Sequence, residues 1–361
     1  MDRLVLAVRR WPWFAVPAVI AVASRAYSLV VLTVVSGLPG MRGTGGLLSV
    51  WDAAWYLRIA SGGYHGGVVH GGRDFAFFPA WPLLVKIASL GGRLPADVVA
   101  AVLANLLFVA AAVLIWRVLE TRMGSAAATG GLALLAFSPP AYVFSLPYAE
   151  PLFLLAVGAY YLAGPTSRWR LPLAALTMVT RIAGAAVVAS ALERAASTRG
   201  RERLAALAAA AAGTLAFAIW WGFIAILTRQ FTGFLHGAPG WGSGRHGLLA
   251  VVAAIRLHSL ARIAWLGFIL VAGVGALLVL RRDRELAVFS IVTIAVALVL
   301  GNTVNSMARY ALTAFPAFAA LADVIGRRDR RLLAALVVCG AVLQVAFVRW
   351  VLLAPPLGVA P

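Results

Sequence analysis

The chain has 361 residues, of which 63% are hydrophobic and only 12% are charged, far from the balance of a soluble globular protein. Its formal net charge is +19, but the basic residues stand in small clusters between apolar runs, which argues against nucleic acid as a partner. The only cysteine, Cys339, lies inside an apolar run, so no internal disulfide can form.

Apolar runs of membrane-spanning length recur along the chain and predict an all-α polytopic membrane protein with about eleven membrane segments. The expected spans are about 12–36, 97–117, 125–138, 150–164, 205–228, 263–280, 286–302, 309–326 and 332–353, with a broken pair of short helices in 171–193. Residues 1–361 are interpreted as a single integral membrane domain.

The arginine clusters predict the orientation. Arg3, Arg9 and Arg10 precede the first span and place the N-terminus in the cytoplasm, and every later dense cluster falls on the same side. Residues 37–95 and 229–262 then form two extracytoplasmic loops that carry short helices. Because the first span lacks a convincing cleavage site, we interpret it as an anchor, which gives a multi-pass protein of the cell membrane.

Most acidic residues lie beside the cytoplasmic arginine clusters, where we expect them to pair with arginine or to be solvated. The acids expected to face outward are Asp52, Asp74, Asp97 and Glu150. Asp97 is most simply a helix-start residue that benefits from the positive end of the helix dipole. The other three are candidates for chemistry on the outer side.

Asp52 stands among aromatic residues directly after the first span, with Trp51, Trp55 and Tyr56 as its neighbours. Tyr56 follows one helical turn later on the same face, so the carboxylate points along the aromatic stripe, which can desolvate it and raise its basicity. The alternative is a capping box in which Ser49 is the N-cap and Asp52 the third helical residue, with the aromatic residues at the membrane interface.

The glycine-rich stretch after this segment is expected to be a mobile loop over the site, at 62–72, with Asp74 solvated beside it. The five histidines all fall in the two outer loops. Their spacings match no metal-binding motif, so we predict neither a metal nor another cofactor.

Four segments resemble one family of mannosyltransferases, which contains the second mannosyltransferase of GPI-anchor synthesis and its bacterial relatives. The first segment has WDAAWY at 51–56, IA at 59–60, GY at 63–64, AFFP at 76–79 and Pro82. The others have SP at 138–139 with FS at 144–145 and YAEPLF at 148–153, TR at 180–181 with Gly184, and SMARY at 306–310 with FP at 315–316. They occur in the family order.

The resemblance implies the GT-C class of membrane glycosyltransferases, which use a polyprenyl-phosphate sugar on the non-cytoplasmic side and an acid in the first outer loop as the base. Asp52 matches that acid. Such a reaction needs one general base and no paired acid, because the lipid phosphate is already a good leaving group. Arginine is suited to hold the phosphate, and Arg181 and Arg309 lie near the outer ends of spans.

We therefore predict an inverting mannosyltransferase that uses a polyprenyl-phosphate-mannose donor, a hydroxyl-bearing glycan or glycolipid acceptor, and membrane lipids as its surroundings. Asp52 is the predicted catalytic base. The predicted substrate-binding residues are Trp51, Trp55, Tyr56, Tyr148, Glu150, Arg181, Arg309 and Tyr310.

Several of these residues have simpler explanations. Glu150 can be a dipole-favoured acid at a helix start, Tyr148 a membrane-interface residue, and Arg309 a cap at the end of its span. Arg181 can reach the interface or pair with Glu150. For the whole chain, the alternative is a multi-span transporter or lipid flippase, which would show broken helices in matching halves, whereas one broken pair is expected here. A catalytically inactive lipid-binding scaffold is a further alternative.

Overall fold

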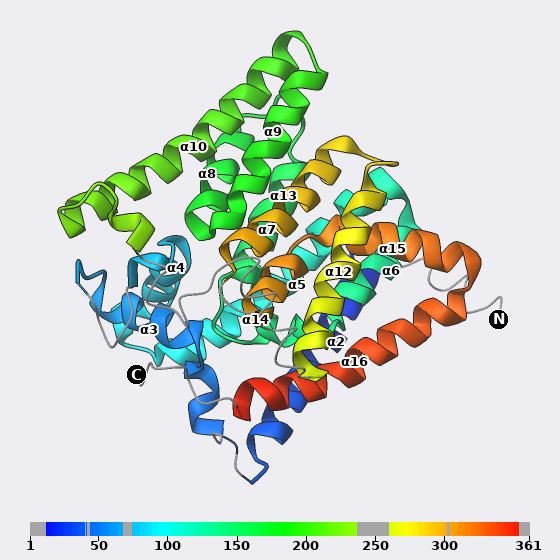
Figure 1. Ribbon diagram of the computed structural model, residues 1–361, viewed down its shortest axis with the longest axis horizontal. Coiled ribbons are helices and arrows are strands. Elements are labelled where there is room, and N and C mark those ends of the chain that lie inside the picture. Colours follow the sequence, from blue (N-terminus) through cyan, green and yellow to red (C-terminus); the bar gives the residue numbers. More distant parts are fainter. Residues whose placement is uncertain are drawn as a thin grey trace.

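A computed structural model describes residues 12–39, 41, 44–67, 74–236, 260–301 and 304–353. Throughout these ranges the regular structure is helical, without a strand, as predicted. Long helices lie along opposite edges of the molecule, α10 (Gly200–Thr228) on one and α16 (Arg330–Leu353) on the other, with the remaining helices between them (Figure 1). This arrangement agrees with helices that satisfy their own backbone in lipid.

Four described helices are long and apolar enough to cross a membrane, and up to six spans result if two bent pairs each count as one. The four are α2 (Ala15–Ser36), α5 (Ala96–Met123), α10 and α16. The shorter helices are α6 (Ser125–Ala136), α7 (Glu150–Leu162), α8 (Arg170–Thr180), α9 (Ala185–Ser197), α12 (Leu260–Val279), α13 (Arg284–Leu300), α14 (Val304–Leu312) and α15 (Phe315–Arg328). Each expected span contains a helix, and the break expected in 171–193 is present between α8 and α9.

Two helix breaks were not predicted. The expected span 309–326 is divided into α14 and α15, which are bent by 70°, and α6 turns by 80° into the 3₁₀ helix η4 (Pro139–Ser145). Pro316 at the start of α15 and Pro139 at the start of η4 favour a new helix start at each point. The expectation of a single broken pair is therefore wrong, and the number of breaks no longer argues against a transporter.

Arg25, buried in α2, supports the bend after α6. Its guanidinium donates to the carbonyl oxygens of Ala136 and Ala141, at 3.1 and 2.9 Å, and to the hydroxyl of Ser145 at 3.0 Å. Its carbon Cζ also lies 4.4 Å from the ring centre of Phe108. Arg25 thus satisfies carbonyl groups that the end of a helix leaves without intrahelical partners.

The first predicted outer loop carries short helices, as expected. They are η1 (Thr44–Ser49), α3 (Asp52–Gly62), η2 (Asp74–Ala76), α4 (Ala80–Ala88) and η3 (Leu90–Gly92). The described start of the second predicted loop contains η6 (Gly233–His236), where the ring of Phe234 lies 6.0 Å from that of Phe78 in the first loop. The predictions for Arg3, Arg9 and Arg10 and for three of the five histidines, His70, His246 and His258, fall outside the described residues.

At the arginine-rich ends of the helices, acids pair with arginine as predicted. Glu285 is buried and contacts Arg194 at 3.1 Å and both Arg122 and Arg170 at 3.5 Å. Asp283 caps α13 by accepting from the backbone of Leu286 and also contacts Arg122 at 2.6 Å. This network joins α5, α8, α9 and α13. Along α8 and α9 it lies at the ends that are far from Arg181, which stands in the break between the two helices.

Candidate active site

Four charged residues from distant parts of the chain meet at the ends of helices. Arg309 Nη2 lies 2.8 Å from Asp52 Oδ2 and 2.7 Å from Glu150 Oε1. Arg181 Nη1 contacts the same Glu150 oxygen at 2.8 Å. The two carboxylates and two guanidinium groups form a cluster without net formal charge, which we call the charge cluster.

Asp52 is the first residue of α3, where the aligned backbone N–H groups favour a negative charge. Trp51, directly before it, has a left-handed backbone (φ 54°), which is strained for a tryptophan. The indole of Trp51 donates to the carbonyl oxygen of Val351 at 3.3 Å, which fixes this turn against α16.

The capping-box alternative for Asp52 is wrong. Ser49 belongs to η1, and its hydroxyl donates to the carbonyl oxygen of Gly46, so it does not cap α3. Asp52 is the first and not the third helical residue. The predicted interfacial stripe is also wrong in part, because Trp55, Tyr56 and Ile59 are buried against α4 and α5.

Glu150 is the first residue of α7, followed by Pro151, a residue suited to a helix start. Tyr148 precedes it, and its hydroxyl donates to the carbonyl oxygen of Val50 at 3.3 Å. The ring of Tyr148 also supports Arg309, whose carbon Cζ lies 4.3 Å from the ring centre. Tyr148 and Glu150, at the start of α7, therefore hold both the backbone before Asp52 and the guanidinium of Arg309.

Arg181 occupies the break between α8 and α9, in an extended conformation. The turn depends on Gly184, because a β-carbon there would lie 2.5 Å from Cα of Met178. The close approach folds η5 (Ile182–Gly184) back onto α8 and aims Arg181 at Glu150. The alternative in which Arg181 pairs with Glu150 is what the structure shows.

Arg309 lies in the last turn of α14 and not at the start of one long span, and its guanidinium pairs with Asp52 and Glu150. The next residue, Tyr310, contributes its ring to the cluster, with Cζ of Arg181 at 4.6 Å from the ring centre. Each arginine of the charge cluster therefore lies over a tyrosine, an arrangement that favours a cation through the ring quadrupole.

Asp52 is the accessible member of the charge cluster. Its side chain is 30% exposed, whereas those of Glu150, Arg181 and Arg309 are 0%, 6% and 8% exposed. Tyr56 lies one turn along α3, and burial raises the pKa of its phenol above the usual range, so it remains a neutral hydroxyl. A substrate entering here would therefore meet Asp52 before the other three charges.

Trp55 is buried within the packing of the first loop. Its ring stacks on Phe77, with the centres 5.9 Å apart, and the guanidinium of Arg58 covers it at 3.9 Å. Among the predicted site residues, Trp55 is thus the one that belongs to the packing between α3 and the segment before α4. Trp55 is buried and packs between α3, α4 and α5.

Sequence reasoning missed three buried polar side chains. Tyr142 of η4 is buried and interacts electrostatically with Arg309, Glu150 and Asp52. Asp74 is fully buried, and His65 bonds to its carboxylate, which overturns the expectation of a solvated Asp74. The third, Arg25, donates to backbone carbonyl groups at the bend after α6. None of the three has a local signal, since each acquires its partners through long-range packing.

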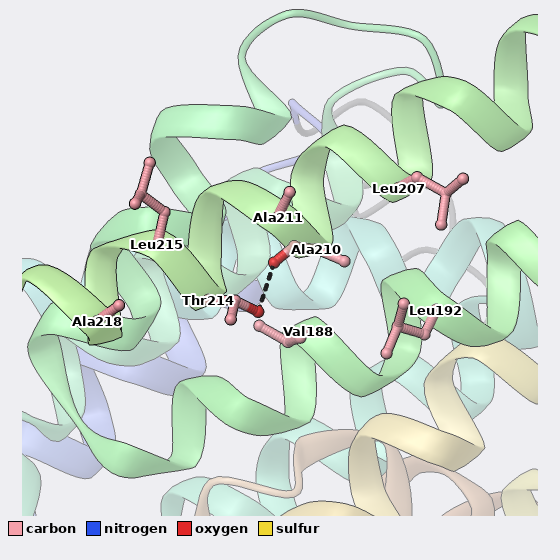
Figure 2. A pocket seen from close by; sticks show the side chains of 8 residues that line it. All are labelled: Val188, Leu192, Leu207, Ala210, Ala211, Thr214, Leu215 and Ala218. Atoms are coloured by element: carbon pink, nitrogen blue, oxygen red, sulfur yellow. Dashed lines mark hydrogen bonds between the residues drawn. The ribbon is translucent and has the colours of Figure 1, made fainter.

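An apolar groove of about 510 Å³ lies between α9 and α10, apart from the charge cluster (Figure 2). It is lined by Val188, Leu192, Leu207, Ala210, Ala211, Thr214, Leu215 and Ala218. The hydroxyl of Thr214 is already used in a 2.9 Å bond to the carbonyl oxygen of Ala210. The groove offers no group for proton transfer or phosphate binding. Elsewhere in the described ranges, no trio of His, Cys, Asp or Glu side chains converges as metal ligands.

These features define a polytopic helical membrane protein with a charge cluster where its helices end. The model of the mannosyltransferase (PIG-V) family matches residues 27–196, slightly less than half of the chain. The matched range contains Asp52, Glu150 and Arg181 and ends before Arg309. The family resemblance predicted from the sequence is confirmed over this range.

In three dimensions the chain is similar to the crystal structure of the Archaeoglobus fulgidus oligosaccharyltransferase determined with zinc and sulfate. The TM-score is 0.48 and the sequence identity 14%, over 91% of this chain and 53% of that one. The chain therefore spans about half the length of that enzyme. No curated protein matches it in sequence.

Proposed function

We propose that the protein is an inverting mannosyltransferase of the GT-C class, located in the cell membrane with its active site on the extracytoplasmic side. It transfers mannose from polyprenyl-phosphate mannose to a hydroxyl group of a glycan or glycolipid. The observation that carries the proposal is the accessible carboxylate of Asp52 beside Arg309, within the range that matches a mannosyltransferase family.

In the proposed reaction the acceptor oxygen attacks the anomeric carbon of mannose while Asp52 takes the hydroxyl proton. The bond from that carbon to the phosphate oxygen breaks, and polyprenyl phosphate leaves with the electron pair. A retaining mechanism would use two carboxylates facing the same sugar. Glu150 is buried and engaged by both arginines, so Asp52 alone faces a substrate, which favours a single displacement.

The arginines supply the charge for the leaving phosphate. Arg309 now shares Nη2 between Asp52 and Glu150. A donor phosphate that binds Arg309 would replace Asp52 as its partner and leave Asp52 unpaired beside the acceptor hydroxyl. Glu150 remains behind the two arginines, out of contact with solvent, so its proposed role is to position them rather than to bind substrate.

The test replaces Asp52 by asparagine, which keeps the size of the side chain and removes the proton acceptor. With radiolabelled polyprenyl-phosphate mannose and native membranes as the acceptor source, transfer should fall by about 10²–10⁴-fold while folding is preserved. Asp97→Asn is a matched control, because Asp97 is also an acid in the first turn of a helix, the membrane-spanning α5. Equal activity of the two variants would overturn the assignment of Asp52.

A further inference from the structure

A second polar group lies beyond the other end of α3 and is not part of the charge cluster. Asp74, the first residue of η2, is fully buried. Its Oδ2 accepts from the backbone N–H of His65 at 2.8 Å and lies 2.9 Å from Nδ1 of the same histidine. One carboxylate oxygen therefore fixes both the backbone and the ring of His65.

The contact with Asp74 determines which nitrogen of His65 is available. A carboxylate beside Nδ1 places the proton on Nδ1 and leaves Nε2 as the outward-facing nitrogen. The His65 side chain is 50% exposed, and its Nε2 has no hydrogen-bond partner among the described residues. The arrangement is an oriented imidazole supported by a buried acid, as is common where histidine binds a ligand.

Two polar atoms of the first loop, Asp74 Oδ1 and Arg58 Nη1, are buried and have no hydrogen-bond partner among the described residues. Buried polar atoms without partners are rare and call for an explanation. Burial lowers the pKa of Arg58 and the charge of Asp74 opposes that shift, so the two side chains are within electrostatic reach of each other. Asp74 Oδ1 can accept and Arg58 Nη1 can donate a hydrogen bond, and hydroxyl groups can serve in either role.

The backbone around His65 is held firmly. A β-carbon on Gly66 would lie 2.4 Å from the carbonyl oxygen of Leu227, so the loop packs directly against the outer end of α10. Tyr64 donates its hydroxyl to the carbonyl oxygen of Phe77 at 3.0 Å, and its ring meets that of Trp220 with the centres 4.9 Å apart. His65 is therefore displayed on a packed segment.

Aromatic side chains connect this position to Asp52. The ring of Tyr56 lies 5.0 Å from that of Phe77, and Phe77 in turn holds Tyr64, the neighbour of His65. Since α3 rises 1.5 Å per residue, its last residue, Gly62, lies about 15 Å along the helix from Asp52, and Cε1 of His65 lies 3.8 Å from the β-carbon position of Gly62. That distance excludes His65 from the proton transfer and suits a remote part of an elongated acceptor.

We propose that His65, oriented by Asp74, forms with Arg58 of the preceding helix a carbohydrate subsite that binds hydroxyl groups of the acceptor at a distance from Asp52. This proposal rests on the proposed function. Hydroxyl groups can both donate to Nε2 of His65 and accept from Arg58, whereas an anion would meet the negative charge of Asp74. His65 contacts the ligand, and Asp74 is a positioning residue.

The test measures binding without turnover. The full chain, carrying ¹³C-labelled histidine in detergent micelles, is titrated with mannobiose and, separately, with inorganic phosphate. The His65 ring signal is identified by its loss in His65→Gln. It should shift saturably with mannobiose, both in the wild type and in Asp52→Asn, and should not shift with phosphate. Asp74→Asn should weaken apparent binding about tenfold, because the ring loses its orienting partner.

The controls separate the possible failures. Asp97→Asn, at the start of α5, should leave the titration unchanged. If Asp74→Asn does not fold, Arg58→Gln replaces it and should also weaken binding. No His65 shift with mannobiose, a shift with phosphate instead, or a shift unaffected by Asp74→Asn and Arg58→Gln would overturn the subsite. The titration of Asp52→Asn measures binding of mannobiose without turnover. A saturable shift would therefore support the subsite even if the proposed mannosyl transfer were wrong.

Discussion

Arg309 donates both Nε and Nη2 to one oxygen of Glu150, at 3.0 and 2.7 Å, and the same Nη2 reaches Asp52. Arg181 uses that Glu150 oxygen as well, so the second oxygen, Oε2, has no partner among the described residues. The buried carboxylate of Glu150 thus contacts two arginines, and the accessible carboxylate of Asp52 supplies the second negative charge of the cluster. Both arginines therefore depend on Glu150 for their position.

Glu150→Gln should destabilise the protein and weaken donor use. The change preserves volume but leaves two buried arginines with Asp52 as their remaining counter-charge, which should lower the free energy of unfolding by about 3–5 kcal/mol. The measurements are thermal unfolding in detergent and the apparent KM for the donor in the folded fraction.

Glu285→Gln is the matched control for that change. Glu285 is also a buried acid shared by arginines, but at the opposite end of the bundle. It should lose comparable stability and keep its donor KM. If both variants changed the donor KM equally, Glu150 would have no particular role in positioning Arg181 and Arg309.

Arg309→Ala should weaken apparent donor affinity by about ten- to a hundredfold, because a charge-assisted contact to phosphate is worth about 1.5–3 kcal/mol. Arg309→Lys should recover only part of this loss, since a single ammonium cannot reproduce the paired contacts of Nε and Nη2. Donor titrations of both variants give the result. Arg201→Ala, at an exposed position, should behave as wild type, and unchanged titrations of Arg309→Ala would contradict phosphate binding by this residue.

Gly184→Ala should disturb the site through the backbone. The added β-carbon would meet Cα and N of Met178 at 2.5 and 2.6 Å, and neither atom can move without shifting α8. We expect a loss of about 1–3 kcal/mol in stability together with reduced donor use, because Arg181 moves with the turn. Gly222→Ala is the control, since nothing lies within 4 Å of its β-carbon and alanine favours a helix. Equal melting temperatures for the two variants would refute the close approach.

Arg25→Leu should destabilise the bend between α6 and η4. The substitution leaves the carbonyl oxygens of Ala136 and Ala141 without their donor, at a cost of about 1–3 kcal/mol for each buried group. Tyr27→Phe removes a single bond, to the carbonyl oxygen of Ala341, and provides the scale for comparison. If Arg25→Leu unfolded at the same temperature as Tyr27→Phe, the bend would not depend on Arg25.

The sequence determined the features that depend on neighbouring residues. Hydropathy predicted the helices, the charge at Arg181 predicted the break between α8 and α9, and the motif around Asp52 predicted the family. Helix starts at Asp97 and Glu150 also followed from local preference. These properties can be predicted because hydrogen bonds within a helix and the choice between water and lipid are decided over a few turns.

Only the tertiary structure decided which charges meet. Asp52, Glu150 and Arg309 come from α3, α7 and α14, and no local pattern says that one arginine bridges two acids. The same holds for Asp74, which glycine-rich surroundings predicted to be solvated and which packing buries against His65. An ion pair depends on the position of both partners in space. That position is set by how whole helices pack, so the sequence supplied the charged groups and the packing of the helices decided their partners.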